Sequence, residues 1–343
     1  MIKAVILFII GLVLLIKGGD WFVDGATGIA ERFHVPELLI GATVVSIGTT
    51  LPEVMVSANS ALSGHGEIAY GNALGSIICN TALIAAITVA VRPGKVDKKT
   101  LRVPVIFFFA AMVIYAVGAY IRGSFERPLG IVLLCVFAVY MFILIRQALL
   151  EMRSGSSAQE GNGDSSGSEG KEGSDKDDPG KKEKPLWKDA ILLVVGAAFI
   201  AVGADLLVDN GTIIAQMMGV PESVIALTFV ALGTSLPELV TAITSLAKGH
   251  GALSLGNVCG ANLFNLVLVS GLSVTLSPFG LPSGKTVNMG GNPVNASLVI
   301  DLPVATLVMV ILTIPALIRG ELKRWQGISL LAIYAGFCVF QFM

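Results

Sequence analysis

The chain has 343 residues, of which 54% are hydrophobic and only 14% are charged, and its mean hydropathy is +0.80. Long apolar runs recur along nearly its whole length, which excludes an ordinary soluble domain and predicts an all-α polytopic membrane protein. The formal net charge is −1 and no basic stretch is long or continuous, so binding to nucleic acid is not expected.

Ten apolar segments, taken in chain order, are each long enough for a transmembrane helix, which needs about 20 residues. The first could pass for a signal peptide, but a similar segment recurs inside the chain, where no signal is cleaved, so we count it as a span. The ten predicted spans are 2–30, 37–62, 68–91, 102–121, 128–149, 187–216, 222–247, 252–275, 296–318 and 325–342.

The segment between the fifth and sixth spans differs sharply in composition from the rest. It is rich in Gly and Ser, highly charged and free of aromatic residues. Such a segment cannot bury enough apolar surface to fold, which predicts a disordered linker. We therefore divide the chain into a first five-helix repeat (1–149), a linker (150–186) and a second five-helix repeat (187–343).

The positive charges of the loops predict the orientation in the membrane, because loops rich in Lys and Arg face the cytosol. The loops on the side opposite the N-terminus carry ten such residues without the linker. We therefore expect both termini outside and the linker in the cytosol, with the cell membrane as the location. The loops on the N-terminal side carry four: Lys3, Arg122, Arg127 and Lys285.

An internal repeat relates the two five-helix units. The separation from Glu53 to Glu238 equals that from Asn80 to Asn265, and we call it the repeat interval. The match extends in both directions without a gap, which is strong evidence for a repeat. Because each unit has an odd number of spans, the second must cross the membrane in the opposite sense. Inverted repeats are typical of secondary transporters, whose substrate site lies near the midplane between the halves.

The stretch "IGTTLPEVM" places Glu53 within the second predicted span, and "LGTSLPELV" repeats the pattern around Glu238. Pro52 has no N–H, so the carbonyl near Gly48 lacks its usual helical partner. Irregular backbone at membrane depth is tolerated only inside protein or beside a wet cavity. The freed carbonyls and the neighbouring hydroxyls are therefore candidate cation ligands. These hydroxyls belong to Thr49, Thr50, Thr234 and Ser235.

Two carboxylates at the same membrane depth need a cation or protons to balance them. One calcium ion balances both charges and accepts many oxygen ligands in a flexible shell, and sodium can use the same oxygens. We expect no Cys or His to line this site, which disfavours zinc and copper. The third and eighth predicted spans add further oxygens, from Ser76, Asn80 and Asn265.

Structural interpretations remain open for several of these residues. Glu53 and Glu238 could form a buried structural pair, although carboxylates inside a membrane are functional by default. The aspartates that the repeat also matches could lie near helix ends in contact with water, and two histidines in Gly-His-Gly stretches could be loop residues. These are Asp20, Asp24, Asp205, Asp209, His65 and His250.

Together with "GNALGSIICN" and "GNVCGANLFN", the motifs "GTTLPE" and "GTSLPE" resemble those of the sodium/calcium exchanger family, within the wider cation/calcium exchangers. The resemblance covers essentially the whole chain. It implies ten transmembrane helices in two inverted five-helix repeats. It also implies exchange of sodium for calcium by alternating access, with no enzymatic reaction, no cofactor and no obligatory protein partner beyond the lipid bilayer.

The resemblance also implies roles for individual residues. Glu53 and Glu238 match the shared acidic ligands of calcium and sodium. Ser46 and Ala231 match positions that contribute backbone carbonyls. The remaining positions match ligands from hydroxyls, carbonyls or amides; they are Thr49, Thr50, Thr234, Ser235, Ser76 and Asn80.

Two positions depart from parts of the family. Ala261 stands where the second motif often has Ser, and the missing hydroxyl bears on one sodium site. Asn265 stands where potassium-dependent members and some prokaryotic ones carry Asp. Potassium-independent animal exchangers resemble this chain in having Asn there, which implies transport without potassium. Animal members also carry large cytosolic calcium-sensing domains, and the linker here contains none.

Three other functions compete with sodium/calcium exchange. The nearest is proton/calcium antiport by the same two glutamates, but protons need no cage of hydroxyl oxygens. An intramembrane aspartyl protease is disfavoured, because Lys17 stands where the first Gly of its GxGD motif should be. A channel is disfavoured as well, because paired inverted broken helices favour alternating access.

Overall fold

The computed structural model describes residues 2–32, 46–96, 98–159, 186–236, 238–239, 242 and 251–343. Two of the predicted spans, 37–62 and 222–247, therefore lie partly outside the described residues. In the first half the helical segments are α1 (Ile2–Arg32), α3 (Ser46–Thr49), α4 (Leu51–Leu62), α5 (Gly66–Cys79), η2 (Asn80–Ala85), α6 (Ala86–Val91), α7 (Lys98–Val117), η3 (Gly118–Arg122) and α8 (Arg127–Gln159).

The second half is also helical. Its segments are α9 (Leu186–Met218), α10 (Glu222–Ile225), η4 (Ala226–Val230), α11 (Ala231–Thr234), α13 (Gly251–Phe264), η5 (Asn265–Val269), α14 (Ser270–Leu276), η6 (Ser297–Asp301), α15 (Leu302–Arg319) and α16 (Arg324–Phe342). Segments labelled η are turns of π-helix. The predicted fold class, an all-α membrane protein, is thus confirmed.

Eight helices among the described residues are long and apolar enough to cross a membrane. Each coincides with one of the predicted spans, apart from small differences at the ends. They are Ile2–Ala26, Gly66–Val91, Leu101–Arg122, Arg127–Leu150, Leu186–Met218, Val258–Leu276, Ser297–Arg319 and Arg324–Phe342. The shorter apolar helix Glu222–Thr234 falls within a ninth predicted span.

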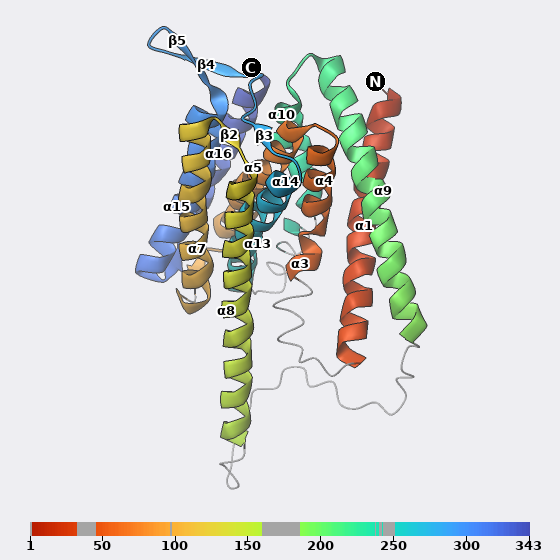
Figure 1. Ribbon diagram of the computed structural model, residues 1–343. Coiled ribbons are helices and arrows are strands. Elements are labelled where there is room, and N and C mark those ends of the chain that lie inside the picture. The colour runs from red at the N-terminus through yellow and green to blue at the C-terminus, as the bar shows by residue number, and fades with distance from the viewer. Residues whose placement is uncertain are drawn as a thin grey trace.

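The fifth helix is longer than expected. α8 continues to Gln159, past the predicted start of the linker at residue 150. The first residues beyond that point, Leu150 to Arg153, are good helix formers, and adding a residue to an existing helix is far easier than starting one. The ends marked N and C lie at one end of the molecule, whereas α8 ends and α9 begins at the other (Figure 1).

Short antiparallel strands connect the helices in a reciprocal pattern. β1 (Gly94–Lys95) in the first half pairs with β6 (Glu321–Leu322) in the second. β3 (Phe279–Gly280) follows β1 by the repeat interval, and it pairs with β2 (Ser124–Phe125) of the first half. The separation from β2 to β6 exceeds the repeat interval, because the hairpin formed by β4 and β5 lengthens the second half. β4 and β5 cover Thr286–Met289 and Asn292–Asn295.

α1 and α9 run antiparallel and lie side by side (Figure 1). Glycines bring their backbones together: a Cβ at Gly18 would lie 2.8 Å from the carbonyl oxygen of Gly196, and one at Gly11 would lie 2.9 Å from that of Gly203. Small residues are the usual means of close helix approach in lipid, where water exclusion does not drive association. The first helices of the two halves therefore pack through matching glycines.

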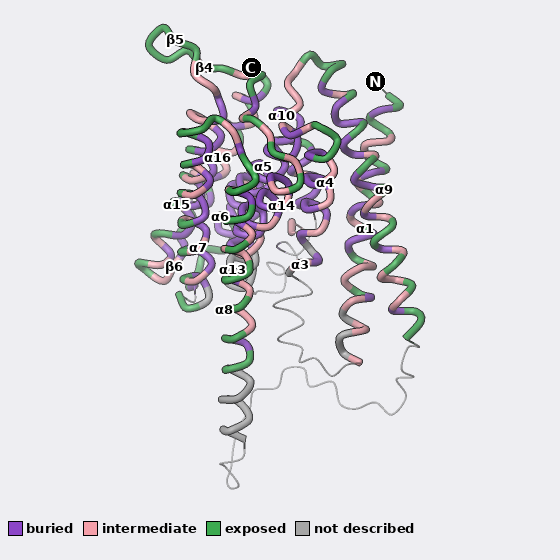
Figure 2. Tube along the Cα trace, viewed as in Figure 1, coloured by how far each residue is buried: buried purple, intermediate pink, exposed green. Residues whose placement is uncertain are grey.

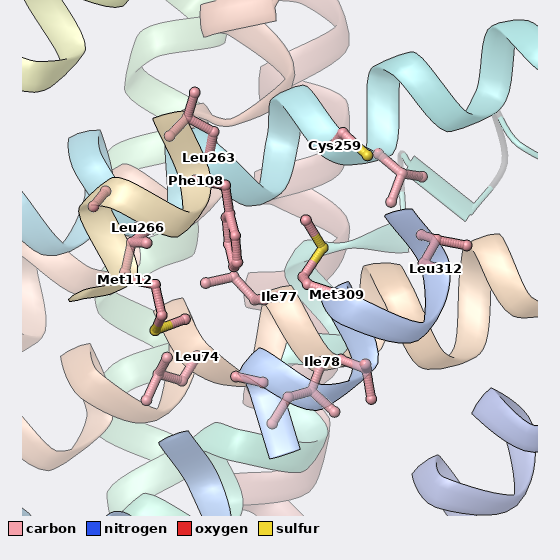
Figure 3. Packing of buried hydrophobic residues seen from close by; sticks show 14 of the residues in the cluster. Leu74, Ile77, Ile78, Phe108, Met112, Cys259, Leu263, Leu266, Met309 and Leu312 are labelled. Carbon is pink, nitrogen blue, oxygen red and sulfur yellow. The ribbon is translucent and has the colours of Figure 1, made fainter. Parts of the chain in front are cut away.

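The centre of the molecule is built from α5 with α6 and from α13 with α14. The span Gly66–Val91 is 78% buried and Val258–Leu276 is 72% buried, against 22% for the span in α8. Buried residues accordingly gather around α5 and α14 (Figure 2). An apolar cluster surrounds these helices and includes Leu74, Ile77, Phe108, Met112, Leu263, Leu266 and Met309 (Figure 3). The polar side chains of α5 and α13 are thus enclosed in a packed interior.

Candidate ion-binding site

Two helix breaks lie at equivalent places in the two halves. Between α3 and α4, Thr50 adopts φ −90° and ψ −2°, and after α11 Ser235 adopts φ −84° and ψ 8°. Ser235 follows Thr50 by the repeat interval. Pro52 lies in the first turn of α4, where a missing N–H costs little. The helix break expected near Pro52 is therefore present, and it lies at Thr50, shortly before the proline.

The first carboxylate projects from the turn that follows the break. Glu53 is in the first turn of α4 and is fully buried, and neither of its carboxylate oxygens has a hydrogen-bond partner among the described residues. The negative charge of Glu238 repels the Glu53 carboxylate, and the side chains of Thr234 and Ser235 lie close to that carboxylate. One oxygen of Glu238, Oε2, is likewise buried without a partner in the described part of the chain. Two carboxylates that repel each other in the protein interior require a cation or protons.

The interior also holds fully buried hydroxyl and amide groups. Ser76 Oγ lies 3.5 Å from Thr234 Oγ1, and both side chains are fully buried. Buried polar atoms normally have partners, so a group of atoms left unpaired by the described residues needs an explanation. A cation that completes its shell with these atoms would supply one. The unpaired oxygens include Ser235 Oγ, Asn80 Oδ1 and Asn265 Oδ1.

Both central helices change to π-helix at their predicted ligand. η2 begins at Asn80 and η5 begins at Asn265, again separated by the repeat interval. A π turn adds a residue to the helical turn, which redirects side chains, and such turns often occur at functional sites. The two asparagines therefore occupy equivalent irregular turns.

Of the remaining predicted ligands, the structure describes Thr50 and Ala231 fully but only the backbone of Ser46 and Thr49. Thr50 is buried, with 1% of its surface exposed. The Ala231 carbonyl accepts the backbone N–H of Ser235 at 3.1 Å. The backbone of Ser46 and Thr49 forms α3, but their side chains lie outside the described residues.

Asn72 is a central residue that the sequence analysis did not place in the site. Its amide Nδ2 donates to the carbonyl oxygen of Glu53 at 3.2 Å and to Ser57 Oγ at 2.8 Å. Its Oδ1 accepts a hydrogen bond from Thr234 Oγ1 at 3.1 Å. A signal was present in the sequence, because Asn72 recurs at Asn257, after a Gly in both copies. A second interior polar contact joins Asn262 Nδ2 to Thr81 Oγ1 at 2.6 Å.

The four aspartates with open interpretations are exposed and His65 is half-buried, in contrast to the fully buried Glu53. Asp20 and Asp205 are well inside α1 and α9, not near helix ends as expected, and both are on the protein surface. Asp205 accepts a hydrogen bond from Asn59 Nδ2 at 2.7 Å. His65, in the turn before α5, contacts Glu222 Oε2 through Nδ1 at 2.9 Å. His250 lies outside the described residues.

The donor set limits which cations fit. No group of three or more His, Cys, Asp or Glu side chains suited to a metal occurs within the described part of the chain. The carboxylate pair must therefore be supplemented by hydroxyl, amide and carbonyl oxygens. Calcium, sodium and related hard cations accept such oxygens, whereas zinc and copper favour nitrogen and sulfur.

Comparison with known proteins agrees with this donor set. A family model described as "Sodium/calcium exchanger protein" matches residues 3–146 and 188–343. The chain is 31% identical over 361 residues to the sodium/calcium exchanger MaX1 of Methanosarcina acetivorans, covering 98% of each protein. It is 35% identical over 278 residues to the inner membrane protein YrbG of Escherichia coli, covering 81% of each.

The fold has a similar counterpart among solved structures. The sodium–calcium exchanger NCX_Mj, in crystals soaked with sodium and strontium, superposes with a TM-score of 0.58 at 29% identity, and 97% of each chain is covered. MaX1 and NCX_Mj are exchangers rather than enzymes, and the chain is likewise an integral membrane protein. From its motifs, its fold and these comparisons, the chain belongs to the sodium/calcium exchanger family.

Proposed function

We propose that the protein is a secondary active antiporter that exchanges sodium for calcium across the membrane by alternating access. The observation that supports this most directly is the carboxylate pair at the two matching helix breaks. Glu53 is fully buried, its two oxygens have no partner among the described residues, and Glu238 lies beside it. A single calcium ion neutralises both charges, and it tolerates the irregular shell that the surrounding oxygens offer.

The proposed architecture is ten transmembrane helices in two inverted repeats, 1–149 and 187–343. The reciprocal strand pairs favour it, because β1 pairs with β6 as β3 pairs with β2. The antiparallel packing of α1 against α9 also favours it. In the proposed orientation both termini lie outside the cell membrane and the linker lies in the cytosol, as the loop charges indicate.

Within this architecture the ions compete for one set of oxygens. Calcium takes both carboxylates, whereas sodium ions take the same carboxylates together with hydroxyls and carbonyls. Because the oxygens cannot serve both ions at once, release of one ion accompanies binding of the other. We assign the ligands to Glu53, Glu238, Thr49, Thr50, Thr234, Ser235, Ser76, Asn80 and Asn265, with backbone carbonyls from Ser46 and Ala231.

Proton/calcium antiport is the second candidate, because two buried carboxylates of this kind can also accept protons. The hydroxyl oxygens around Thr234 and Ser235 favour sodium, since a proton needs no such shell. Uptake of radioactive calcium into vesicles separates the two functions. We expect uptake when the vesicles are loaded with sodium, at equal pH on both sides. Uptake driven only by a proton gradient would assign the protein to the second class.

We predict that exchange does not require potassium. Asn265 is neutral, so the proposed ligand set has no third carboxylate to balance an additional monovalent ion. The initial rate of calcium uptake should be equal in potassium-free and potassium-containing buffer at constant ionic strength. As a control, each rate is measured with and without the sodium gradient. An absolute potassium requirement would contradict the assignment of Asn265.

We predict that the linker is dispensable for turnover. Its composition cannot form a packed domain, and it contains no motif resembling a calcium-binding loop. Residues 160–185 lie outside the described residues, and replacing them with a Gly/Ser chain half as long should leave a flexible tether spanning roughly 20 Å. The initial uptake rate per inserted protein and its calcium dependence should be unchanged. Loss of an activating effect of calcium would instead assign a regulatory role to the linker.

A further inference from the structure

We infer that Asn72 is a positioning residue for the ion site. It accepts a hydrogen bond from the Thr234 hydroxyl, and this leaves the lone pairs of the Thr234 oxygen and the Ala231 carbonyl available to a cation. Asn72 lies on α5 in the first half and is fully buried. Both ends of its amide have partners, and one of these partners, Thr234, belongs to the second half. The inference deepens the proposed exchange function and rests on it.

The surroundings of Asn72 determine which way its amide faces. The carbonyl oxygen of Glu53, 3.2 Å from Asn72 Nδ2, can only accept a hydrogen bond. An amide turned the other way would place two acceptor oxygens against each other. The NH₂ group therefore faces Glu53 and Ser57, and Oδ1 faces Thr234. Because Oδ1 is an acceptor, Thr234 must be the donor in the 3.1 Å contact.

The single hydroxyl proton of Thr234 has other possible acceptors, and Ser76 Oγ, at 3.5 Å, is one of them. Thr234 Oγ1 lies 3.3 Å from the carbonyl oxygen of Ala231, one turn earlier in α11. That carbonyl already accepts the backbone N–H of Ser235 at 3.1 Å. A carbonyl oxygen has two lone pairs, so a bond from Thr234 would occupy the second one. Asn72, at the shorter distance, draws the proton away and leaves that lone pair available.

The same hydrogen bond orients the oxygen of Thr234. With its proton directed to Asn72, the hydroxyl presents its lone pairs to the other side. Glu53 and Ser76 are its neighbours in the site. A cation beside Glu53 then receives two oxygens from one short stretch of chain, the Thr234 hydroxyl and the Ala231 carbonyl.

The hydroxyl that anchors the amide is not repeated in the sequence of the second half. Ser57 accepts from Asn72 at 2.8 Å, which holds the NH₂ group on the side of α4. The repeat places Ala242 at the position that matches Ser57, and Ala242 has no hydroxyl. The two halves therefore differ at this polar contact, although their helix breaks match.

The test is a double-mutant cycle between Asn72 and Thr234. Asn72→Leu keeps the branched shape of the side chain but removes the acceptor, so the Thr234 hydroxyl turns to its other acceptors, which include the Ala231 carbonyl. We expect the calcium concentration for half-maximal uptake to rise about 10-fold, which is typical of losing one buried hydrogen bond. Thr234→Val alone should produce a similar rise. The double variant should differ little from either single one, whereas independent effects would multiply to about 100-fold.

Asn72→Asp provides the matched comparison. Its carboxylate can still accept the Thr234 proton, but it can no longer donate to Ser57 or to the Glu53 carbonyl. Thr234→Val should therefore raise the half-maximal calcium concentration by its full factor of about 10 in the Asn72→Asp background. Because the cycle compares the same Thr234 change in each background, those effects of the added charge that do not involve Thr234 cancel. Size-exclusion chromatography in detergent shows whether each variant is folded. If Asn72→Leu does not fold, the near-isosteric Asn72→Asp variant still provides a decisive test.

Ser57→Ala separates positioning from packing. It removes a partner of the Asn72 amide but leaves the bond to Thr234, so its half-maximal calcium concentration should change less than that of Asn72→Leu. An equal change in Ser57→Ala and Asn72→Leu, or additive effects of Asn72 and Thr234, would overturn the inference. Absence of sodium-driven uptake by the unaltered protein would instead overturn the proposed function itself.

Discussion

Replacing Glu53 with Gln is expected to reduce sodium-driven calcium uptake by at least about 100-fold, and Glu238→Gln should do the same. Each change leaves one buried carboxylate without the second charge needed to balance a divalent cation. Removing one partner of a buried charge group costs about 3–5 kcal/mol, which corresponds to a loss of this size. The measurement is the initial rate of uptake into vesicles, normalised to the amount of inserted protein.

Glu67→Gln is the matched control for this experiment. Glu67 is in the first turn of α5, is only half-buried, and accepts a hydrogen bond from the backbone N–H of Ser283 at 3.2 Å. It lies outside the carboxylate pair, so the same chemical change should leave uptake nearly unaltered. Normal calcium affinity in both Glu53→Gln and Glu238→Gln would refute the assignment of these residues as ligands.

A single methyl group at Gly75 should strongly impair the protein. A Cβ there would lie 2.7 Å from the carbonyl oxygen of Leu227 and 2.7 Å from the Cβ of Ala231. α5 must then move away from η4 and α11, the segments that carry Ala231 and lead to Thr234. Such overpacking costs about 1–3 kcal/mol. We expect Gly75→Ala to lower the melting temperature in detergent by several degrees and to weaken calcium binding as well.

Gly260→Ala is the control, because Gly260 follows Gly75 by the repeat interval. A Cβ at Gly260 would meet no atom within 4 Å among the described residues. The same substitution in the same kind of helix should therefore be tolerated, and its helix propensity should even favour it. Equal melting temperatures for the two variants would contradict the close approach of α5 to η4 and α11.

Much of the fold could be predicted from the sequence, because the bilayer imposes simple requirements. A span needs a long apolar run, and a proline within it removes a helical hydrogen bond. The eight membrane-length helices among the described residues follow the first requirement, and the break at Thr50 beside Pro52 follows the second. The repeat could be recognised as well, because the matching residues keep a constant interval along the chain. The sequence carries no comparable signal for the short strands and the π turns, because these elements depend on which loops and helices contact one another in the folded protein.

By itself, then, the sequence determined the membrane class and the repeat, and it singled out Glu53 and Glu238 as candidate ligands, since these depend on residue types at local spacing. Only the tertiary structure placed the two carboxylates together, because they come from distant segments in opposite halves of the chain. It alone also showed Asn72 bridging the Glu53 carbonyl and Thr234. Local sequence cannot reveal such a contact, because a buried asparagine finds its partners wherever close packing brings a donor or an acceptor within hydrogen-bond distance.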